Sequence, residues 1–218
     1  MCIRDSFDLD GTIVNTAPDL MAAHNHVMKK YGYAQKKLED IKSLAGKGAW
    51  IMMQRSFKDE IKDEKVKKEM TKEFIDFYSK NIDRASVPIK GTIDFLVWAK
   101  SKNISMAVCT NKQERLASDL LKKLDMHKYF EYVAGSDTFA FNKPDPRHLT
   151  DVVEIIGGDL KKTIMVGDSE VDAMSAHNAK LPFVLVKDGY TEKTEKEIKH
   201  DELISDFVNF EKILQKYL

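Results

Sequence analysis

The second half of the chain alternates short apolar runs with amphipathic stretches, and this alternation restricts the fold more than any other sequence feature. The apolar runs lie at 104–109, 132–134, 164–166 and 183–186. Continuous apolar runs of this length are typical of strands buried on both faces of a parallel sheet. Amphipathic helices are predicted at 91–102, 113–124, 146–156 and 170–179. Repeated strand–helix units predict an α/β fold with a Rossmann-like parallel sheet and right-handed crossovers.

A further strand is predicted at the N-terminus, directly before residues 7–12, Phe-Asp-Leu-Asp-Gly-Thr. A strand inside a parallel sheet should be apolar on both faces, whereas residues 4–6 are Arg-Asp-Ser. An unpaired buried charge there would be strongly destabilising. We therefore hypothesise that residues 1–6 are not the native start of the protein, and that an apolar run at 3–6 would raise the melting temperature.

Residues 16–85 follow a different pattern, with apolar residues at helical spacing. Helices are predicted over about 16–31, 38–44 and 63–81, and another apolar pattern begins at Trp50. The residues therefore predict a small α-helical domain, 16–85, inserted into a core domain made of 1–15 and 86–218. The tail from about 203 to 218 is predicted to add a closing strand and helix to the core.

Three local details of the helical domain can be interpreted. Thr16 and Asp19 have the spacing of a capping box. His24 lies on the apolar stripe of the first helix, which indicates a packed, hydrogen-bonded side chain rather than a ligand. The charged residues at 58–73 indicate a solvated helix face.

Composition excludes several classes of partner. Lys plus Arg number 35 and Asp plus Glu number 35, so no net charge favours nucleic acid or an anionic membrane. Cys2 and Cys109 are the only cysteines and no zinc-ligand spacing occurs, which indicates a reducing compartment. No apolar run reaches the about 18 residues of a membrane span, and no signal-peptide pattern is present. We expect a cytoplasmic monomer or homodimer without nucleic-acid or membrane partners.

Polar residues follow the predicted strands at the points where those strands end. These residues are Asp8, Asp10, Gly11 and Thr12 after the first strand, Thr110 and Asn111 after 104–109, Lys143 in a later loop, and Asp168 and Asp172 after 164–166. Because ligands of open parallel sheets bind beyond the carboxyl ends of the strands, these residues are expected to converge on one site.

The converging residues predict phosphoryl transfer. Four aspartates in one cavity would repel one another unless a divalent cation joined them, and oxygen ligands without thiolates favour Mg²⁺ over zinc. Lys143 and Thr110 can hold phosphoryl oxygens. Asp8 is then the predicted nucleophile, and Asp10 the acid that protonates the leaving alkoxide and later activates water.

The helical domain offers a candidate substrate contact in Gly46, Lys47 and Gly48, at the start of a predicted helix. Backbone N–H groups and the lysine ammonium there could meet an anion. A flexible connector with a solvated lysine explains the same residues equally well.

Four motifs in order resemble those of the haloacid dehalogenase-like hydrolase superfamily. They are Asp-Leu-Asp-Gly-Thr at 8–12, the strand ending in Cys-Thr-Asn at 109–111, Lys-Pro-x-Pro at 143–146 and Gly-Asp-Ser-x-x-Asp at 167–172. The resemblance implies a mobile cap over a Rossmann-like core, one Mg²⁺ and hydrolysis of small phosphomonoesters. It also implies that Asp8, Asp168 and the backbone carbonyl of Asp10 bind the metal, with Asp172 close by.

The inserted region is similar to the cap of the phosphoglycolate phosphatase-like branch, through Thr-Ala-Pro-Asp-Leu at 16–20 and the Gly-Lys-Gly segment. The resemblance thus implies 2-phosphoglycolate as substrate. Asn15 departs from the family, where an aspartate is common at that position.

Other functions remain open. Dehalogenases and phosphonate-cleaving relatives lack the second aspartate of the first motif, so Asp10 favours a phosphatase. A mutase such as β-phosphoglucomutase keeps both aspartates and is excluded only by the similarity of the cap. Sugar phosphates, nucleotides and pyrophosphate are alternative substrates. A binding module for a metal and a phosphorylated ligand is the non-enzymatic alternative.

Overall fold

The computed structural model describes residues 4–57 and 63–217. Its central sheet has six strands in the order β5-β4-β1-β6-β7-β8, and each pair of neighbours is parallel. The strands are β1 (Arg4–Phe7), β4 (Ser105–Cys109), β5 (Tyr132–Ala134), β6 (Thr163–Gly167), β7 (Phe183–Val186) and β8 (Glu202–Ile204). The predicted α/β fold with a parallel sheet is therefore confirmed.

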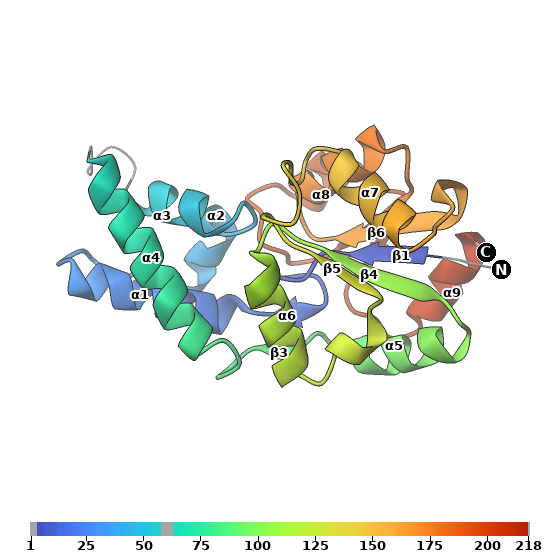
Figure 1. Ribbon diagram of the computed structural model, residues 1–218, viewed down its shortest axis with the longest axis horizontal. Helices are drawn as coiled ribbons and strands as arrows, with labels where there is room; N and C mark the ends of the chain where they lie inside the picture. Colours follow the sequence, from blue (N-terminus) through green and yellow to red (C-terminus); the bar gives the residue numbers. More distant parts are fainter. Residues whose placement is uncertain (1–3, 58–62, 218) are drawn as a thin grey trace.

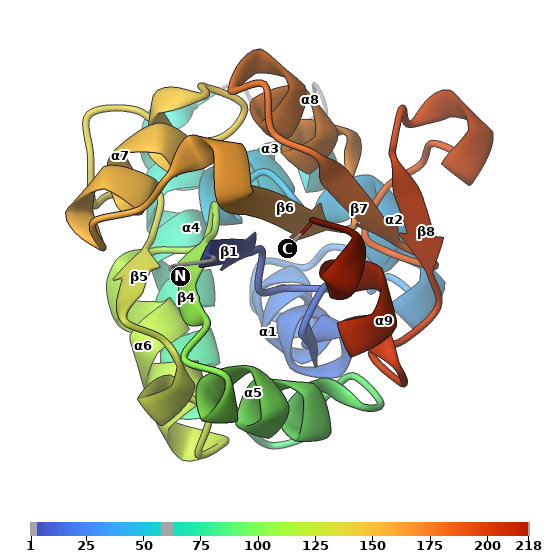
Figure 2. The same cartoon turned by 90° about the vertical axis from the view of Figure 1, so that its right-hand side faces the viewer.

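Helices cover both faces of this sheet, as Figure 2 shows with α7 and α8 above it and α5, α6 and α9 below. Their bounds are α5 (Thr92–Ser101), α6 (Glu114–Lys123), α7 (Arg147–Ile155), α8 (Glu170–Asn178) and α9 (Phe210–Leu214). Short 3₁₀ helices are η2 (His127–Tyr129), η3 (Leu160–Lys162), η4 (Glu195–Glu197) and η5 (Gln215–Tyr217). Successive side chains of a strand point into the two resulting cores in turn: Val108 packs into the lower core, with α5, α6 and α9, and Cys109 into the upper core, with α7 and α8.

The strand β1 lies in the middle of the sheet although its first residues are polar. Phe7 is completely buried and contacts the rings of Phe95 and Phe207 in the lower core. Strands β4 and β6 flank β1 with parallel pairing along its whole length, so the tertiary pairing outweighs the polar sequence at 4–6. The hypothesis about the origin of residues 1–6 stays a prediction.

In the described part of 16–85, four helices and a short 3₁₀ turn form a separate layer beyond the carboxyl ends of the strands, here called the helical insertion (Figure 1). Its elements are α1 (Ala17–Lys30), η1 (Leu38–Asp40), α2 (Ile41–Leu44), α3 (Ala49–Phe57) and α4 (Glu64–Lys80). The antiparallel strands β2 (Val14–Asn15) and β3 (Val87–Pro88) pair where the chain enters and leaves this layer. The helices match the predicted ones, and the domain boundaries at 16 and 85 stay a prediction.

The predicted capping box at the start of α1 is wrong. The Thr16 side chain makes no capping hydrogen bond. Asp19 is buried and accepts hydrogen bonds instead from the backbone N–H groups of Ala85 at 3.0 Å and Ser86 at 2.8 Å. The carboxylate therefore ties α1 to the returning connection. This buried site outcompetes a local cap because it supplies several donors at once.

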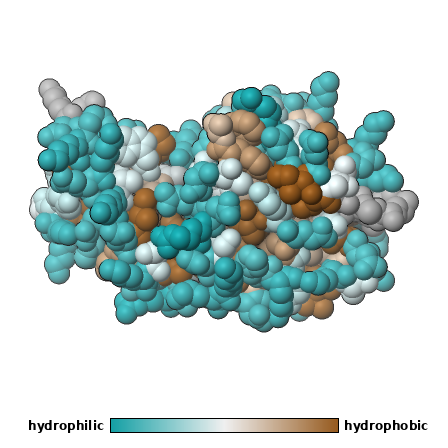
Figure 3. All heavy atoms as spheres, in the orientation of Figure 1, coloured by the Kyte–Doolittle hydropathy of each residue, from teal (hydrophilic) through white to brown (hydrophobic). Residues whose placement is uncertain are grey.

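The interpretation of His24 is confirmed. The side chain is buried, its Nε2 lies 2.7 Å from Ser56 Oγ, and burial lowers its pKa. The solvated face is also confirmed for its described part, because Lys65, Lys68 and Glu69 of α4 are exposed and this side of the molecule is mainly hydrophilic (Figure 3). Residues 58–62 of that predicted face lie outside the described residues.

The closing strand and helix predicted for the tail are confirmed by β8 and α9, whose Phe210 and Leu214 are buried in the lower core. Among residues 4–57 and 63–217, no helix combines the length and apolarity needed to span a bilayer.

Candidate active site

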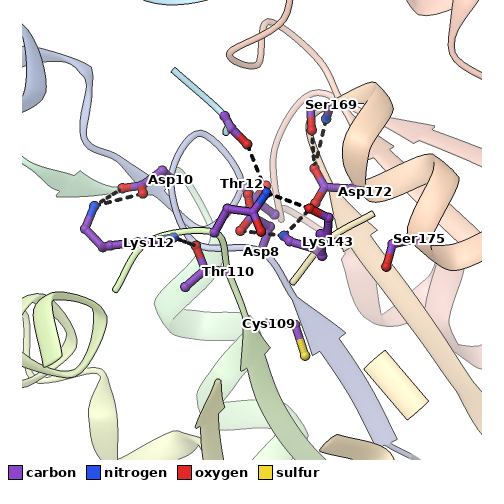
Figure 4. A network of polar contacts seen from close by, with 12 residues as sticks. Asp8, Asp10, Thr12, Cys109, Thr110, Lys112, Lys143, Ser169, Asp172 and Ser175 are labelled. Atoms are coloured by element: carbon purple, nitrogen blue, oxygen red, sulfur yellow. Dashed lines mark hydrogen bonds and ion pairs between the residues drawn. The ribbon is translucent and has the colours of Figure 1, made fainter. Parts of the chain in front are cut away.

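The loops that follow β1, β4 and β6 meet at the carboxyl edge of the sheet, on the side that faces the helical insertion (Figures 1 and 4). Asp8 directly follows β1 and Asp168 directly follows β6. The Asp8 backbone N–H donates to the Val166 carbonyl at 2.9 Å, which extends the β1–β6 pairing into the loop. Adjacent parallel strands thus bring two aspartates that are distant in sequence to one position.

A tight turn after Asp8 shapes this position. Gly11 adopts φ +81°, a backbone conformation that residues other than glycine rarely adopt, and a Cβ there would lie 2.4 Å from Asp168 Oδ2. The Thr12 hydroxyl donates to Asp168 Oδ1 at 3.1 Å. The two residues therefore orient Asp168, and neither belongs to the lining of the cavity that Asp8 and Asp10 face.

Three carboxylates form a compact acidic group. Asp8, Asp168 and Asp172 are buried, and each offers an oxygen within 4.8 Å of the others. Burial, with the neighbouring charges of Asp172 and Asp8, raises the pKa of Asp168 well above its usual range. Such crowding is costly without a positive charge nearby.

Lys143 supplies one such charge. Its Nζ lies 2.8 Å from Asp8 Oδ1 and 2.6 Å from Asp172 Oδ1, and its side chain is buried. Burial alone would lower the pKa of Lys143, but the carboxylates of Asp172 and Asp8 outweigh this effect and raise it. For Asp8, burial is the largest effect and raises the pKa to about 6, although Lys143 opposes it.

Asp172 also holds the loop after β6. Its Oδ2 accepts hydrogen bonds from the Ser169 hydroxyl at 2.6 Å and from the Ser169 backbone N–H at 3.1 Å, forming a capping box at the start of α8. With Oδ1 on Lys143, both oxygens of Asp172 have partners. The residue therefore positions Lys143 and Asp168 as well as adding negative charge.

The acidic group fits a hard divalent cation. All three donors are carboxylates, and Asp8 Oδ1 is buried without a hydrogen-bond partner, since its ion pair with Lys143 lacks hydrogen-bond geometry. Carboxylate oxygens are the ligands that Mg²⁺ and Ca²⁺ prefer. The Asp8 and Asp168 carboxylates are close enough to share one ion, as the sequence predicted, while the Asp10 carboxylate is not part of the group.

The Asp10 carboxylate instead contacts Lys112. Its two oxygens lie 2.6 and 2.8 Å from Lys112 Nζ, and the lysine side chain is 5% exposed. Lys112 was not predicted as a site residue. Its place directly after Thr110 and Asn111, in a loop already expected to carry site residues, was the available signal.

Thr110 and Asn111 anchor the loop after β4. The Thr110 hydroxyl accepts a hydrogen bond from the Lys112 backbone N–H at 3.2 Å. The Asn111 side-chain amide donates to the Lys143 carbonyl at 3.1 Å, whereas its Oδ1 is buried without a partner. An acceptor in the cavity wall thus remains for a ligand.

Tyr190 is a second residue that the sequence analysis missed. Its backbone N–H donates to Asp168 Oδ2 at 2.6 Å, and its hydroxyl accepts from the backbone N–H groups of Thr16 at 2.9 Å and Ala17 at 2.7 Å. Tyr190 therefore connects the acidic group to the start of the helical insertion. No local sequence pattern predicts this role, because Thr16 is 174 residues away from Tyr190 in the chain.

A cavity of about 380 Å³ lies between the acidic group and the helical insertion. Asp8, Asp10, Thr110, Asn111 and Lys112 line its sheet side. The opposite side is lined mainly by apolar groups, including Trp50, Met52, Phe74, Ile75 and Tyr78, together with Gly46, Lys47 and Gly48. The Lys47 ammonium lies 3.5 Å from Glu170, so this lysine also bridges the insertion and α8.

The fold and the site define an α/β protein with a buried group of carboxylates at the carboxyl edge of its parallel sheet, and sequence comparison places it in a family. The sequence model of the haloacid dehalogenase-like hydrolases matches residues 6–186, so the chain belongs to this family. The family predicted from the four motifs is confirmed.

Two relatives of similar length are both named phosphoglycolate phosphatase. The phosphoglycolate phosphatase of Agrobacterium fabrum is 39% identical over 218 residues, covering 96% of this chain and 93% of the relative. The phosphoglycolate phosphatase of Mesorhizobium japonicum is 36% identical, covering 92% and 89%. These relatives confirm the predicted phosphoglycolate phosphatase-like branch.

Solved structures agree with the fold. A predicted phosphoglycolate phosphatase from Haemophilus somnus superimposes with a TM-score of 0.90 at 27% identity, covering 96% of both chains. The β-phosphoglucomutase of Clostridium difficile superimposes with a TM-score of 0.82 at 22% identity, covering 100% of this chain and 97% of the other. The second likeness concerns the fold alone.

Proposed function

We propose that the protein is a Mg²⁺-dependent phosphatase that hydrolyses 2-phosphoglycolate through an aspartyl phosphate. The observation that carries this proposal is the buried group of Asp8, Asp168 and Asp172 with Lys143 beside it, of which Asp8 lines the cavity. Its support comes from relatives at 35–39% identity that are named phosphoglycolate phosphatases.

The proposed roles follow the predicted ones. Asp8 attacks phosphorus and releases the alkoxide of the substrate, and water then hydrolyses the aspartyl phosphate to regenerate the carboxylate. Asp10 protonates the leaving alkoxide in the first step and accepts a proton from water in the second. Lys143 compensates the negative charge of the phosphoryl group, and Thr110 binds its oxygens.

Asp8, Asp168 and the backbone carbonyl of Asp10 are the proposed metal ligands, with Asp172 close by. A bound Mg²⁺ supplies positive charge to the phosphoryl group and relieves the repulsion among the carboxylates. We also propose that residues 16–85 form a cap over a core domain of 1–15 and 86–218, with Gly46, Lys47 and Gly48 facing the substrate. The cytoplasmic location and the monomeric or homodimeric state stay predictions from the sequence.

The test is phosphate release from 2-phosphoglycolate, glucose 1-phosphate, AMP, pyrophosphate and p-nitrophenyl phosphate, each with Mg²⁺ and with EDTA. We expect the highest kcat/KM for 2-phosphoglycolate, no turnover in EDTA and no turnover for Asp8→Asn. Folded protein that releases no phosphate from any of them would indicate a binding module. Formation of glucose 6-phosphate from β-glucose 1-phosphate would indicate a mutase.

A further inference from the structure

The proposed hydrolysis leaves one buried cation of the cavity without a task. Lys143 contacts the nucleophile Asp8, whereas the Lys112 ammonium contacts the Asp10 carboxylate and the Tyr78 ring and lies on the cavity wall. Burying a lysine is costly unless an anion compensates for the lost hydration, and Asp10 is that anion here. Once the Asp10 carboxylate turns to the leaving group, Lys112 requires another anion, which the ligand can supply.

The substrate brings a suitable anion. Hydrolysis of 2-phosphoglycolate releases glycolate, whose carboxylate must be accommodated in the cavity together with the phosphoryl group. Among the described residues that line the cavity, Lys47 and Lys112 carry the positive side chains. A site for the carboxylate must use one of them or rely on backbone N–H groups.

Burial favours Lys112 over Lys47. The Lys47 side chain is 40% exposed and its ammonium already lies near Glu170, whereas the Lys112 side chain is only 5% exposed. An ion pair in a buried, apolar environment is stronger than one that water and salt screen. Trp50, Phe74 and Ile75 provide such an environment on the opposite wall.

The helical insertion orients the Lys112 ammonium. Lys112 Nζ lies 4.7 Å from the centre of the Tyr78 ring, within the range of a cation–π contact. Tyr78 belongs to α4, while Lys112 follows β4, so the ammonium is held between the two layers. A fixed ammonium can select a carboxylate by position and not only by charge.

The Lys112 ammonium already binds a carboxylate, that of Asp10. The two oxygens of Asp10 lie 2.6 and 2.8 Å from Lys112 Nζ, so this site accepts both oxygens of one carboxylate. The carboxylate of a substrate would compete with Asp10 for these contacts. Its binding would leave the Asp10 side chain free to face the oxygen of the leaving group.

We propose that Lys112 binds the carboxylate of the leaving group and thereby selects phosphate monoesters of small hydroxy acids, with Tyr78 holding the ammonium in place. This inference rests on the proposed function, because it assigns the specificity of the same site. It makes Lys112, and not Lys47, the residue that distinguishes 2-phosphoglycolate from an uncharged ester.

The test compares 2-phosphoglycolate with ethyl phosphate, which has a methyl group in place of the carboxylate. For Lys112→Met we expect the ratio of the two kcat/KM values to fall by about 10-fold to 150-fold, the range for a hydrogen bond to a charged group. In the wild type, 2-phosphoglycolate displaces Asp10 from Lys112 and ethyl phosphate does not. Lys112→Met frees Asp10 for both esters, so the loss of this difference also lowers the ratio. Lys112→Arg should keep part of the selectivity.

Matched variants locate the effect. Lys47→Met should leave the ratio within about threefold of the wild type, and Tyr78→Phe, which keeps the ring, should do the same. Tyr78→Leu should lower the ratio. A ratio that falls with Lys47→Met and not with Lys112→Met would overturn the proposal.

A binding measurement keeps the inference testable without turnover. Glycolate should raise the melting temperature of the wild type and of Lys112→Arg, and should not raise that of a folded Lys112→Gln variant. If the wild type selects 2-phosphoglycolate and Lys112→Met keeps that selectivity, the inference fails and the proposed function stands. If the wild type hydrolyses neither ester, the proposed function fails, and the glycolate shift alone decides the inference. Equal hydrolysis of both esters by the wild type overturns the inference and leaves the proposed hydrolysis of 2-phosphoglycolate standing.

Discussion

Replacing Asp8, the proposed nucleophile, by Asn should stabilise the ion-free protein while it abolishes turnover. Asp8 is buried, and burial is the main reason why its pKa is raised from 3.8 to about 6. An ionised Asp8 therefore costs folding free energy that a neutral amide of the same shape does not. Lys143 keeps its partner Asp172 at 2.6 Å, so the substitution leaves no unpaired buried lysine.

The size and the sign of this effect follow from proton linkage. Between pH 3.8 and about pH 6 the folded state binds more protons at Asp8 than the unfolded state, so this group makes stability fall as the pH rises. Above that window the full cost is present, about 3 kcal/mol for a pKa raised to this extent. At pH 4.5 the cost falls to about 1 kcal/mol because folded Asp8 is mostly protonated.

Urea unfolding in EDTA measures the difference. We expect Asp8→Asn to exceed the wild type in unfolding free energy by up to about 3 kcal/mol at pH 8 and by about 1 kcal/mol at pH 4.5. Saturating Mg²⁺ should stabilise the wild type more than the variant, since Asp8 is a proposed ligand. A variant less stable than the wild type at pH 8 in EDTA would refute the reasoning.

Three further substitutions test the supporting residues. Gly189→Ala would place a Cβ 2.3 Å from Asp168 Cβ, so we expect Mg²⁺ affinity and activity to fall by about 10-fold or more. The control is Gly32→Ala, whose Cβ would have no atom within 4 Å, and this variant should keep its Mg²⁺ affinity. His148 is buried, and burial lowers its pKa from 6.5 to about 4, so the folded state binds fewer protons than the unfolded state between these pH values. As the pH falls from 6.5 to 4, the unfolding free energy of the wild type should therefore drop by about 3 kcal/mol more than that of His148→Gln. Equal losses in the two proteins would contradict the assignment. Tyr190→Phe removes the acceptor of the Thr16 and Ala17 backbone N–H groups, so urea unfolding should show a loss of about 1–3 kcal/mol, and an unchanged midpoint would argue against this link.

Much of the core could be predicted because its signals are local. The run at 183–186 became β7 (Phe183–Val186) without a shift, since a continuous apolar stretch identifies a buried strand wherever it lies. The proximity of Asp8 and Asp168 was also predictable, because both follow parallel strands and such strands end at one edge of the sheet.

The contacts that complete the site could not be predicted in the same way. Lys112 meets Asp10 across 102 residues of sequence, and Asp19 meets Ser86 across 67. The capping box predicted for Thr16 and Asp19 failed because a distant backbone segment supplied better donors than the local helix end. Local spacing carries no information about such partners.

Strands, helices and the polar side chains at strand ends can be predicted from the chain, since they depend on neighbours within a few positions. The sharing of Lys143 by Asp8 and Asp172, and the contact of Asp10 with Lys112, become visible in the folded protein alone. These pairings depend on how loops from different strands and the helical insertion pack together in three dimensions. The burial that results from this packing makes each ion pair strong enough to define the chemistry of the cavity.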